Sequence, residues 1–191
     1  MRRKIFLLVA LSMFIFFGCT DEGKTSFSDE NKASEAKVEK KSTKDRKKSD
    51  DLVLTTLDDE KISIVKEKDG VKFSNQNNRV ILLNFFATWC PPCKAEIPHL
   101  NSLQEKYRDD LLILSVALED KDVETLLSFK EFYNINYTIT HGMANFKFSE
   151  LLGGVQTIPY MVLYDKDGKY LKHYNGIVPE EMLEADISRQ L

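Results

Sequence analysis

The chain has 191 residues, which is enough for one domain of ordinary size once the two ends are set aside. Acidic side chains outnumber basic ones, and the residues from 52 onward hold 15 basic and 21 acidic groups, a net charge of −6. Because such a domain repels phosphate, composition argues against nucleic acid as a partner.

Residues 1–18 have the pattern of an export signal. Arg2, Arg3 and Lys4 precede thirteen apolar or small residues at positions 5–17. This run is shorter than the roughly 17 residues that a membrane-spanning helix needs. We therefore expect a cleaved signal peptide, and the alternative is a short anchor that stays attached.

Cys19 ends the stretch Phe16-Phe17-Gly18-Cys19. This stretch resembles a bacterial lipobox, with Phe16 at the position where lipoboxes usually carry Leu. The resemblance implies that Cys19 is lipidated and becomes the first residue after cleavage. Cys90 and Cys93 would then be the only thiols of the mature chain.

Residues 19–51 are strongly charged and poor in apolar side chains. Positions 20–51 hold nine basic and nine acidic groups and one aromatic residue, Phe27. Such a segment cannot bury enough apolar surface to fold, so we expect a flexible tether. A coil of about 32 residues has a typical reach of about 30 Å, which would hold the domain of residues 52–191 close to a membrane.

The domain opens with three short β-rich runs, at positions 52–57, 62–66 and 71–73. Charged and glycine-containing turns separate these runs, so we predict N-terminal strands joined by tight turns. Two near-continuous apolar runs follow, at 80–86 and 111–118, and they are typical of strands covered on both faces of a mostly parallel sheet.

A helix is predicted between these two apolar runs, because Ile97, Leu100, Leu103 and Tyr107 recur at helical spacing. Pro98 should kink this helix or end its first segment, since proline removes a hydrogen bond and clashes with the preceding turn. Further on, we predict helices over 123–133, over 145–152 and after Pro179, and strands over 137–140, 160–164 and 170–174.

Trp89-Cys90-Pro91-Pro92-Cys93 lies where the buried strand turns into the helix. A cysteine at a helix N-terminus faces unpaired backbone N–H groups and the positive end of the dipole, which stabilise a thiolate. Cys90 is therefore the predicted nucleophile, and Cys93 has the spacing to close a disulfide with it and to resolve a mixed disulfide. The two prolines suit a first helical turn.

A zinc site is the alternative use of a Cys-x-x-Cys pair. Such a site needs four ligands, and the sequence has no second cysteine pair. His99, His141 and His173 could supply nitrogen ligands, but their spacing makes no metal pattern. The strand-turn-helix context favours redox chemistry with no metal and no bound cofactor.

With these residues in place, residues 52–191 resemble the thioredoxin superfamily and, within it, the membrane-tethered TlpA/ResA-type thiol-disulfide oxidoreductases. The resemblance rests on the continuous stretch 84–98 around the motif and on Thr157-Ile158-Pro159. It implies a thioredoxin-like α/β fold, with a central mixed sheet flanked by helices and an N-terminal β extension.

The resemblance also implies roles for residues around the cysteines. Pro159 would be cis and face the disulfide, and the backbone of Ile158 would pair with a bound substrate strand. Trp89 would pack beside the motif, shield Cys90 and contribute to substrate binding, with an ordinary core aromatic as the alternative. Glu96 matches a family glutamate that lies near the disulfide, and we expect it to assist proton transfer at Cys93.

Asn84 and Glu96 both bear on which group could accept the proton of Cys93. Thioredoxins carry a buried Asp where Asn84 stands, and because Asn cannot take a proton, that position cannot hold the base that activates Cys93. For Glu96 the alternative is a solvated helix face, which is the usual place of a glutamate on an amphipathic helix.

These observations predict an exported, lipid-anchored enzyme of the bacterial cell envelope, facing the periplasm or extracytoplasmic space. It would reduce disulfides of envelope proteins, apocytochrome c among them, and be recharged by a DsbD/CcdA-type membrane reductant. Disulfide oxidase or isomerase activity is the alternative. Copper-binding chaperones share the fold, but they carry Cys-x-x-x-Cys, whereas this chain has Cys-x-x-Cys. Peroxiredoxins also share the fold, but their reactive cysteine follows in the pattern Thr-x-x-Cys, and here Ala87 stands at the position of the threonine.

Overall fold

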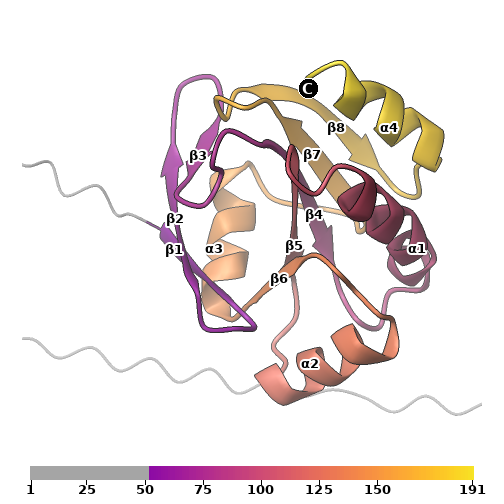
Figure 1. The fold of residues 1–191 in the computed structure, drawn as a ribbon. Helices are drawn as coiled ribbons and strands as arrows, with labels where there is room; N and C mark the ends of the chain where they lie inside the picture. The colour runs from indigo at the N-terminus through magenta and orange to yellow at the C-terminus, as the bar shows by residue number, and fades with distance from the viewer. Residues whose placement is uncertain (1–51) are drawn as a thin grey trace, which may run out of the picture. The chain divides into compact units, whose positions relative to one another are not determined.

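The computed structural model describes residues 52–191 (Figure 1). The predicted signal peptide at 1–18, the lipidation site Cys19 and the tether at 19–51 lie outside the described residues. Within the described part, no helix is long and apolar enough to cross a membrane.

One mixed sheet of eight strands forms the centre of the domain, in the order β3-β2-β1-β6-β5-β4-β7-β8. The strands are β1 (Leu52–Thr56), β2 (Lys61–Lys66), β3 (Val71–Phe73), β4 (Val80–Phe86), β5 (Leu111–Ala117), β6 (Thr138–His141), β7 (Tyr160–Tyr164) and β8 (Tyr170–Asn175). Strands β4, β5 and β6 run parallel, and the other pairs are antiparallel. The predicted α/β architecture with an N-terminal β extension is therefore confirmed.

Strands β4 and β5 are buried along their whole length, as their continuous apolar sequences predict. They pair in parallel from Val80 opposite Leu111 to Phe86 opposite Ala117. Parallel neighbours bring their carboxyl ends to the same edge of the sheet, which is where α/β proteins place their functional groups.

Four helices cover the two faces of the sheet: α1 (Pro91–Lys106), α2 (Val123–Phe132), α3 (Met143–Leu151) and α4 (Glu180–Ser188). Side chains of α1, α2 and α4 enter one apolar core, which also contains both cysteines of the motif. Phe148 of α3 packs in the second core, together with strands of the N-terminal extension. Helices α1 and α4 lie side by side (Figure 1), joined by a hydrogen bond from Ser102 to Glu180.

The N-terminal extension is fixed to the sheet at two places. Strand β1 pairs with β6 through Thr55 and Thr56. The turn before β3 meets the turn before β8, where Val71 N–H donates to Gly168 O at 2.8 Å. A side chain at Gly70 would collide with the backbone of Gly168, so this approach requires glycine.

Every predicted helix and strand of the domain is present, with ends that differ by one or two residues. The expectation that Pro98 ends the first segment of its helix is wrong, because α1 continues through Pro98 to Lys106. Pro98 lies on the exposed side of the helix. Water can therefore satisfy the carbonyl that loses its helical partner.

Candidate active site

Cys90 and Cys93 form a disulfide at the start of α1, with their Cα atoms 5.3 Å apart. Cys90 is the N-cap of the helix, and its Sγ accepts a hydrogen bond from Cys93 N–H at 3.2 Å. Pro91 and Pro92 occupy the first two helical positions, as predicted. The sulfur of Cys90 thus stands where a helix offers backbone N–H groups to a negative charge.

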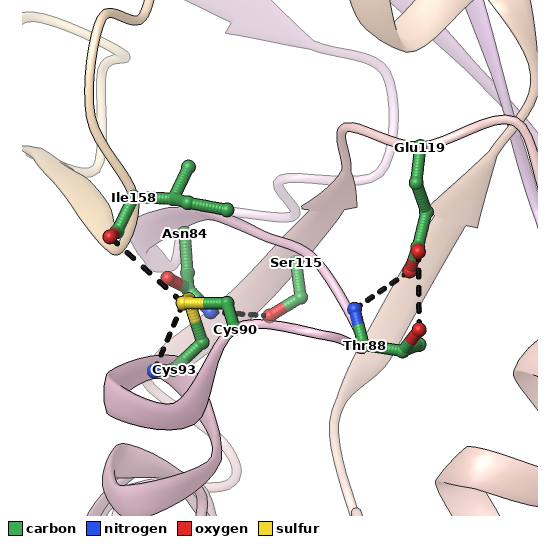
Figure 2. Close-up of a disulfide and its surroundings, with 7 residues drawn as sticks. All are labelled: Asn84, Thr88, Cys90, Cys93, Ser115, Glu119 and Ile158. Carbon is green, nitrogen blue, oxygen red and sulfur yellow. Dashed lines mark hydrogen bonds between the residues drawn. A yellow bond between two sulfur atoms is a disulfide. The ribbon is translucent and has the colours of Figure 1, made fainter.

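The peptide bond between Ile158 and Pro159 is cis, as the resemblance implies. It lies beside the disulfide, with Ile158 O 3.8 Å from Cys90 Sγ (Figure 2). A sulfur in a disulfide has no proton to donate, so this distance describes proximity in the oxidised state. Cys90 is only 2% exposed, so little of its side chain is open to a large partner in this oxidised state.

Trp89 precedes the nucleophile and is 64% exposed. The alternative that it is an ordinary core aromatic is therefore wrong. Large apolar side chains exposed beside a reactive group are available for contact with a partner protein. Its predicted roles in shielding Cys90 and binding substrate stay predictions.

Asn84 of β4 is buried and belongs to the surroundings of the disulfide (Figure 2). Its Nδ2 donates to Ser115 Oγ on the neighbouring strand at 3.0 Å. Its Oδ1 has no hydrogen-bond partner within residues 52–191. An amide cannot exchange a proton at neutral pH, so the site requires a different proton acceptor.

Glu96 supplies a buried carboxyl group to this site and is 1% exposed. The solvated-face alternative is therefore wrong. Glu96 lies one helical turn after Cys93, a spacing that places two Cβ atoms about 5–6 Å apart on one helix face. Burial raises the pKa of Glu96 to about 7, against the opposing effect of the Val178 N–H group, which donates to Oε1 at 2.9 Å.

Tyr137 lies close enough to Glu96 for the Glu96 carboxylate to disfavour ionisation of the phenol. The pKa of this buried phenol is raised by desolvation and then by the Glu96 carboxylate. Tyr137 therefore stays neutral at physiological pH and adds no charge to the site. The Oε2 atom of Glu96 has no hydrogen-bond partner among the described residues, so one oxygen of this buried carboxyl is unpaired, on the helix that carries Cys93 one turn earlier.

Two residues of the site, Thr88 and Glu119, do not follow from the motif. Glu119 is a buried carboxylate that accepts hydrogen bonds from the backbone and hydroxyl groups of Thr88 (Figure 2). The feature that could have indicated their contact is the register of β4 with β5, in which Phe86 lies opposite Ala117. Thr88 comes two residues after Phe86, and Glu119 comes two residues after Ala117, so the two side chains leave the sheet at the same level. A register cannot be read from one sequence.

Within the described range we find no metal-binding cluster, that is, no group of three or more His, Cys, Asp or Glu side chains that could hold a metal ion. The three histidines come from different elements: His99 from α1, His141 from β6 and His173 from β8. The structure brings together Cys90, Cys93 and the Ile158–Pro159 loop instead, and Glu96 lies buried on α1 one helical turn after Cys93.

Residues 63–191 match the model of the Redoxin family. The chain is 33% identical over 145 residues to the thiol-disulfide oxidoreductase ResA of Bacillus thuringiensis (strain Al Hakam), covering 75% of this chain and 76% of that protein. The same figures hold for the ResA of Bacillus anthracis. Both relatives are therefore matched over most of their length.

Solved structures share the fold. A protein of Chlorobium tepidum that carries the name thiol:disulfide interchange protein DsbE is 28% identical, with a TM-score of 0.57 over 68% of this chain and 92% of that one. StoA of Bacillus subtilis, at 22% identity, has a TM-score of 0.54 over 70% and 92% of the two chains. These neighbours confirm the predicted thioredoxin-like fold.

Proposed function

The chain belongs to the Redoxin family and is a TlpA/ResA-type thiol-disulfide oxidoreductase of the thioredoxin superfamily, and from this premise we propose that it reduces disulfides of envelope proteins. The observation that carries the proposal is the position of Cys90 as the N-cap of α1, with Glu96 buried one turn beyond Cys93. Candidate substrates are proteins with exposed cysteine pairs, apocytochrome c among them.

In the proposed reaction the reduced enzyme starts with a Cys90 thiolate and a Cys93 thiol. The thiolate attacks one sulfur of the partner's disulfide, which forms a Cys90–partner disulfide and releases the second partner sulfur as a thiolate. Cys93 then gives its proton to the Glu96 carboxylate and attacks Cys90 Sγ. This step closes the Cys90–Cys93 disulfide and releases the partner's remaining thiolate, so that two electrons have passed to the partner.

Four features support the assigned roles. The backbone N–H groups at the start of α1 favour a thiolate on Cys90. A pKa of about 7 lets Glu96 both take and return a proton near neutral pH. The Ile158–Pro159 loop, 3.8 Å from the nucleophile, offers backbone groups with which an extended substrate segment can pair. Exposed Trp89 supplies an apolar contact at the same edge.

The enzyme acts at a membrane in this proposal, held by a lipid on Cys19 and the charged tether. A DsbD/CcdA-type membrane reductant restores the dithiol by the reverse exchange. The reaction uses sulfur chemistry alone and needs no bound cofactor.

Replacing Cys19 by Ser is expected to move the protein from the membrane fraction to the soluble fraction and to abolish incorporation of radiolabelled palmitate. Unchanged membrane retention would contradict the anchor.

The substrate assignment is tested by trapping. In the Cys93→Ser variant the mixed disulfide on Cys90 cannot be resolved, so partner proteins should accumulate as covalent adducts that a reductant releases. The matched control is the Cys90→Ser variant, which should trap none of them. Identification of the adducts by mass spectrometry supports the proposal if they are exported proteins with cysteine pairs. Equal trapping by both variants would overturn it.

A further inference from the structure

Thr88 and Glu119 come from two loops that leave the same edge of the sheet. Strand β4 ends at Phe86 and β5 at Ala117, and these two residues are paired in register. The pairing continues for one more residue, since Leu118 N–H donates to Phe86 O at 2.9 Å. The loop that carries the nucleophile therefore runs alongside the loop that carries Glu119.

Glu119 holds Thr88 with both of its carboxylate oxygens. Thr88 N–H donates to Oε1 at 2.7 Å, and Thr88 Oγ1 donates to Oε2 at 3.0 Å (Figure 2). Glu119 is 7% exposed and forms no salt bridge within residues 52–191. A buried carboxylate is costly unless it is hydrogen-bonded, and bonds to a charged acceptor are the strong ones.

Thr88 stands two residues before the nucleophile, inside a short turn in which Cys90 N–H donates to Ala87 O at 3.1 Å. The direction of this turn determines where Cys90 Sγ lies relative to Cys93 N–H, at 3.2 Å, and to Ile158 O, at 3.8 Å. Fixing the backbone and the hydroxyl of Thr88 together leaves the turn little freedom to rotate.

We propose that Glu119 is a positioning residue for the nucleophile: by clamping Thr88 it holds Cys90 at the N-terminus of α1 in the geometry that favours the thiolate. Glu119 touches no reacting atom and acts through Thr88. The inference concerns the thiol chemistry of Cys90 and holds for any disulfide partner, so it can fail or succeed separately from the substrate assignment.

The test compares Glu119→Ala with Glu119→Gln in the reduced full chain. Alkylation of Cys90 by iodoacetamide is followed from pH 5 to 9 by mass spectrometry of the Cys90 peptide, alongside thermal unfolding. Alanine removes both hydrogen bonds, and we expect Cys90 to react about tenfold more slowly at neutral pH because its thiolate is less favoured. The adjacent exposed carboxylate supplies the control variant, Asp120→Ala, which should match the wild type.

Glutamine separates geometry from charge. Its carbonyl oxygen can accept from Thr88 N–H, and its amide can donate to Thr88 Oγ1, so the clamp is retained while the negative charge is lost. We expect Glu119→Gln to react at least as fast as the wild type. A glutamine variant as slow as the alanine variant would overturn the proposal, because charge rather than position would then be responsible. An alanine variant with the wild-type pH profile would overturn it as well.

Thr88 provides a second route if Glu119→Ala does not fold. Thr88→Val removes only the hydroxyl bond and Thr88→Ser retains it. The proposal predicts slower alkylation of Cys90 in the valine variant and wild-type alkylation in the serine variant, at equal thermal stability. Equal rates in the two variants would contradict it.

Discussion

Helices α1 and α2 begin with the same backbone arrangement but different chemical groups. Each follows one of the two central parallel strands, and each has an N-cap residue in extended conformation whose side chain accepts from the N–H group three residues later. At α1 the acceptor is the sulfur of Cys90, bonded to Cys93 N–H. At α2 it is the carboxylate of Asp122, bonded to Thr125 N–H at 2.7 Å.

Burial separates the two helix starts. Asp122 lies in solvent, and hydrogen bonds from Thr125 hold its pKa below the usual value. At α1 the cap is buried, and the acidic group of the next turn, Glu96, has its pKa raised by desolvation. The same capping device therefore stabilises a helix where water is present, and holds the sulfur of Cys90 at backbone N–H groups where water is excluded.

The largest expected effect comes from making one substitution at both caps. Cys90→Ser retains a good N-cap but replaces the thiolate by a hydroxyl, so reduction of an insulin disulfide should fall to the uncatalysed rate. Asp122→Ser should keep full activity. Residual turnover by Cys90→Ser above the uncatalysed rate would show that Cys93 can act as the nucleophile.

Glu96→Gln should give the next largest effect, on the pH profile of thiol exchange. Below about pH 7 the Glu96 carboxyl is protonated and cannot accept the Cys93 proton, so the wild-type rate should rise through that pH. The variant should lack this rise and be slower at pH 8 by about a hundredfold, the lower end of general base catalysis. Glu131→Gln on the exposed side of α2 is the control; identical profiles for all three proteins would refute the role.

The free energy of unfolding should also depend on Glu96. Its contribution falls as pH rises, whereas the contribution of Asp122 grows as pH rises. The folded-state pKa of Glu96, about 7, lies above the ordinary 4.5, so the folded protein binds more protons between these values and loses stability as pH rises through them. From pH 5 to pH 8 the oxidised wild type should lose on the order of 2 to 3 kcal/mol relative to Glu96→Gln, measured by urea unfolding. Parallel stability curves would contradict the buried charge.

Asp122 should show the smallest effect. Its lowered pKa contributes stability that is present above the unfolded value of 3.8 and is lost as pH falls through the folded value. Asp122→Ala should lower the melting temperature at pH 7 by a few degrees, whereas Asp122→Asn, an equally good cap, should lower it less. A larger loss in the asparagine variant would mean that charge, and not capping, dominates at this helix.

Much of this arrangement could be predicted from the sequence, because it depends on local patterns. The continuous apolar runs of β4 and β5 identified the central strands, and the position of Cys90 between strand and helix identified the cap. The cis bond before Pro159 followed from the resemblance and not from the residues alone.

The remainder depends on contacts between distant segments. The hydrogen bond to Glu96 comes from Val178 N–H, 82 residues away in sequence, and the clamp on Thr88 comes from Glu119, 31 residues away. Both contacts need the register and packing of the folded sheet. The exposure of Pro98, which lets α1 continue, also depends on which face of the helix meets the core.

The reduction potential of the Cys90–Cys93 couple tests the central claim most directly. The full chain with Cys19 replaced by Ser would be equilibrated against redox buffers and its two remaining thiols quantified. A reductase of partner disulfides requires a potential near that of thioredoxin, about −270 mV. A value near about −120 mV, as in DsbA, would make the protein an oxidant and contradict the proposed direction of electron flow.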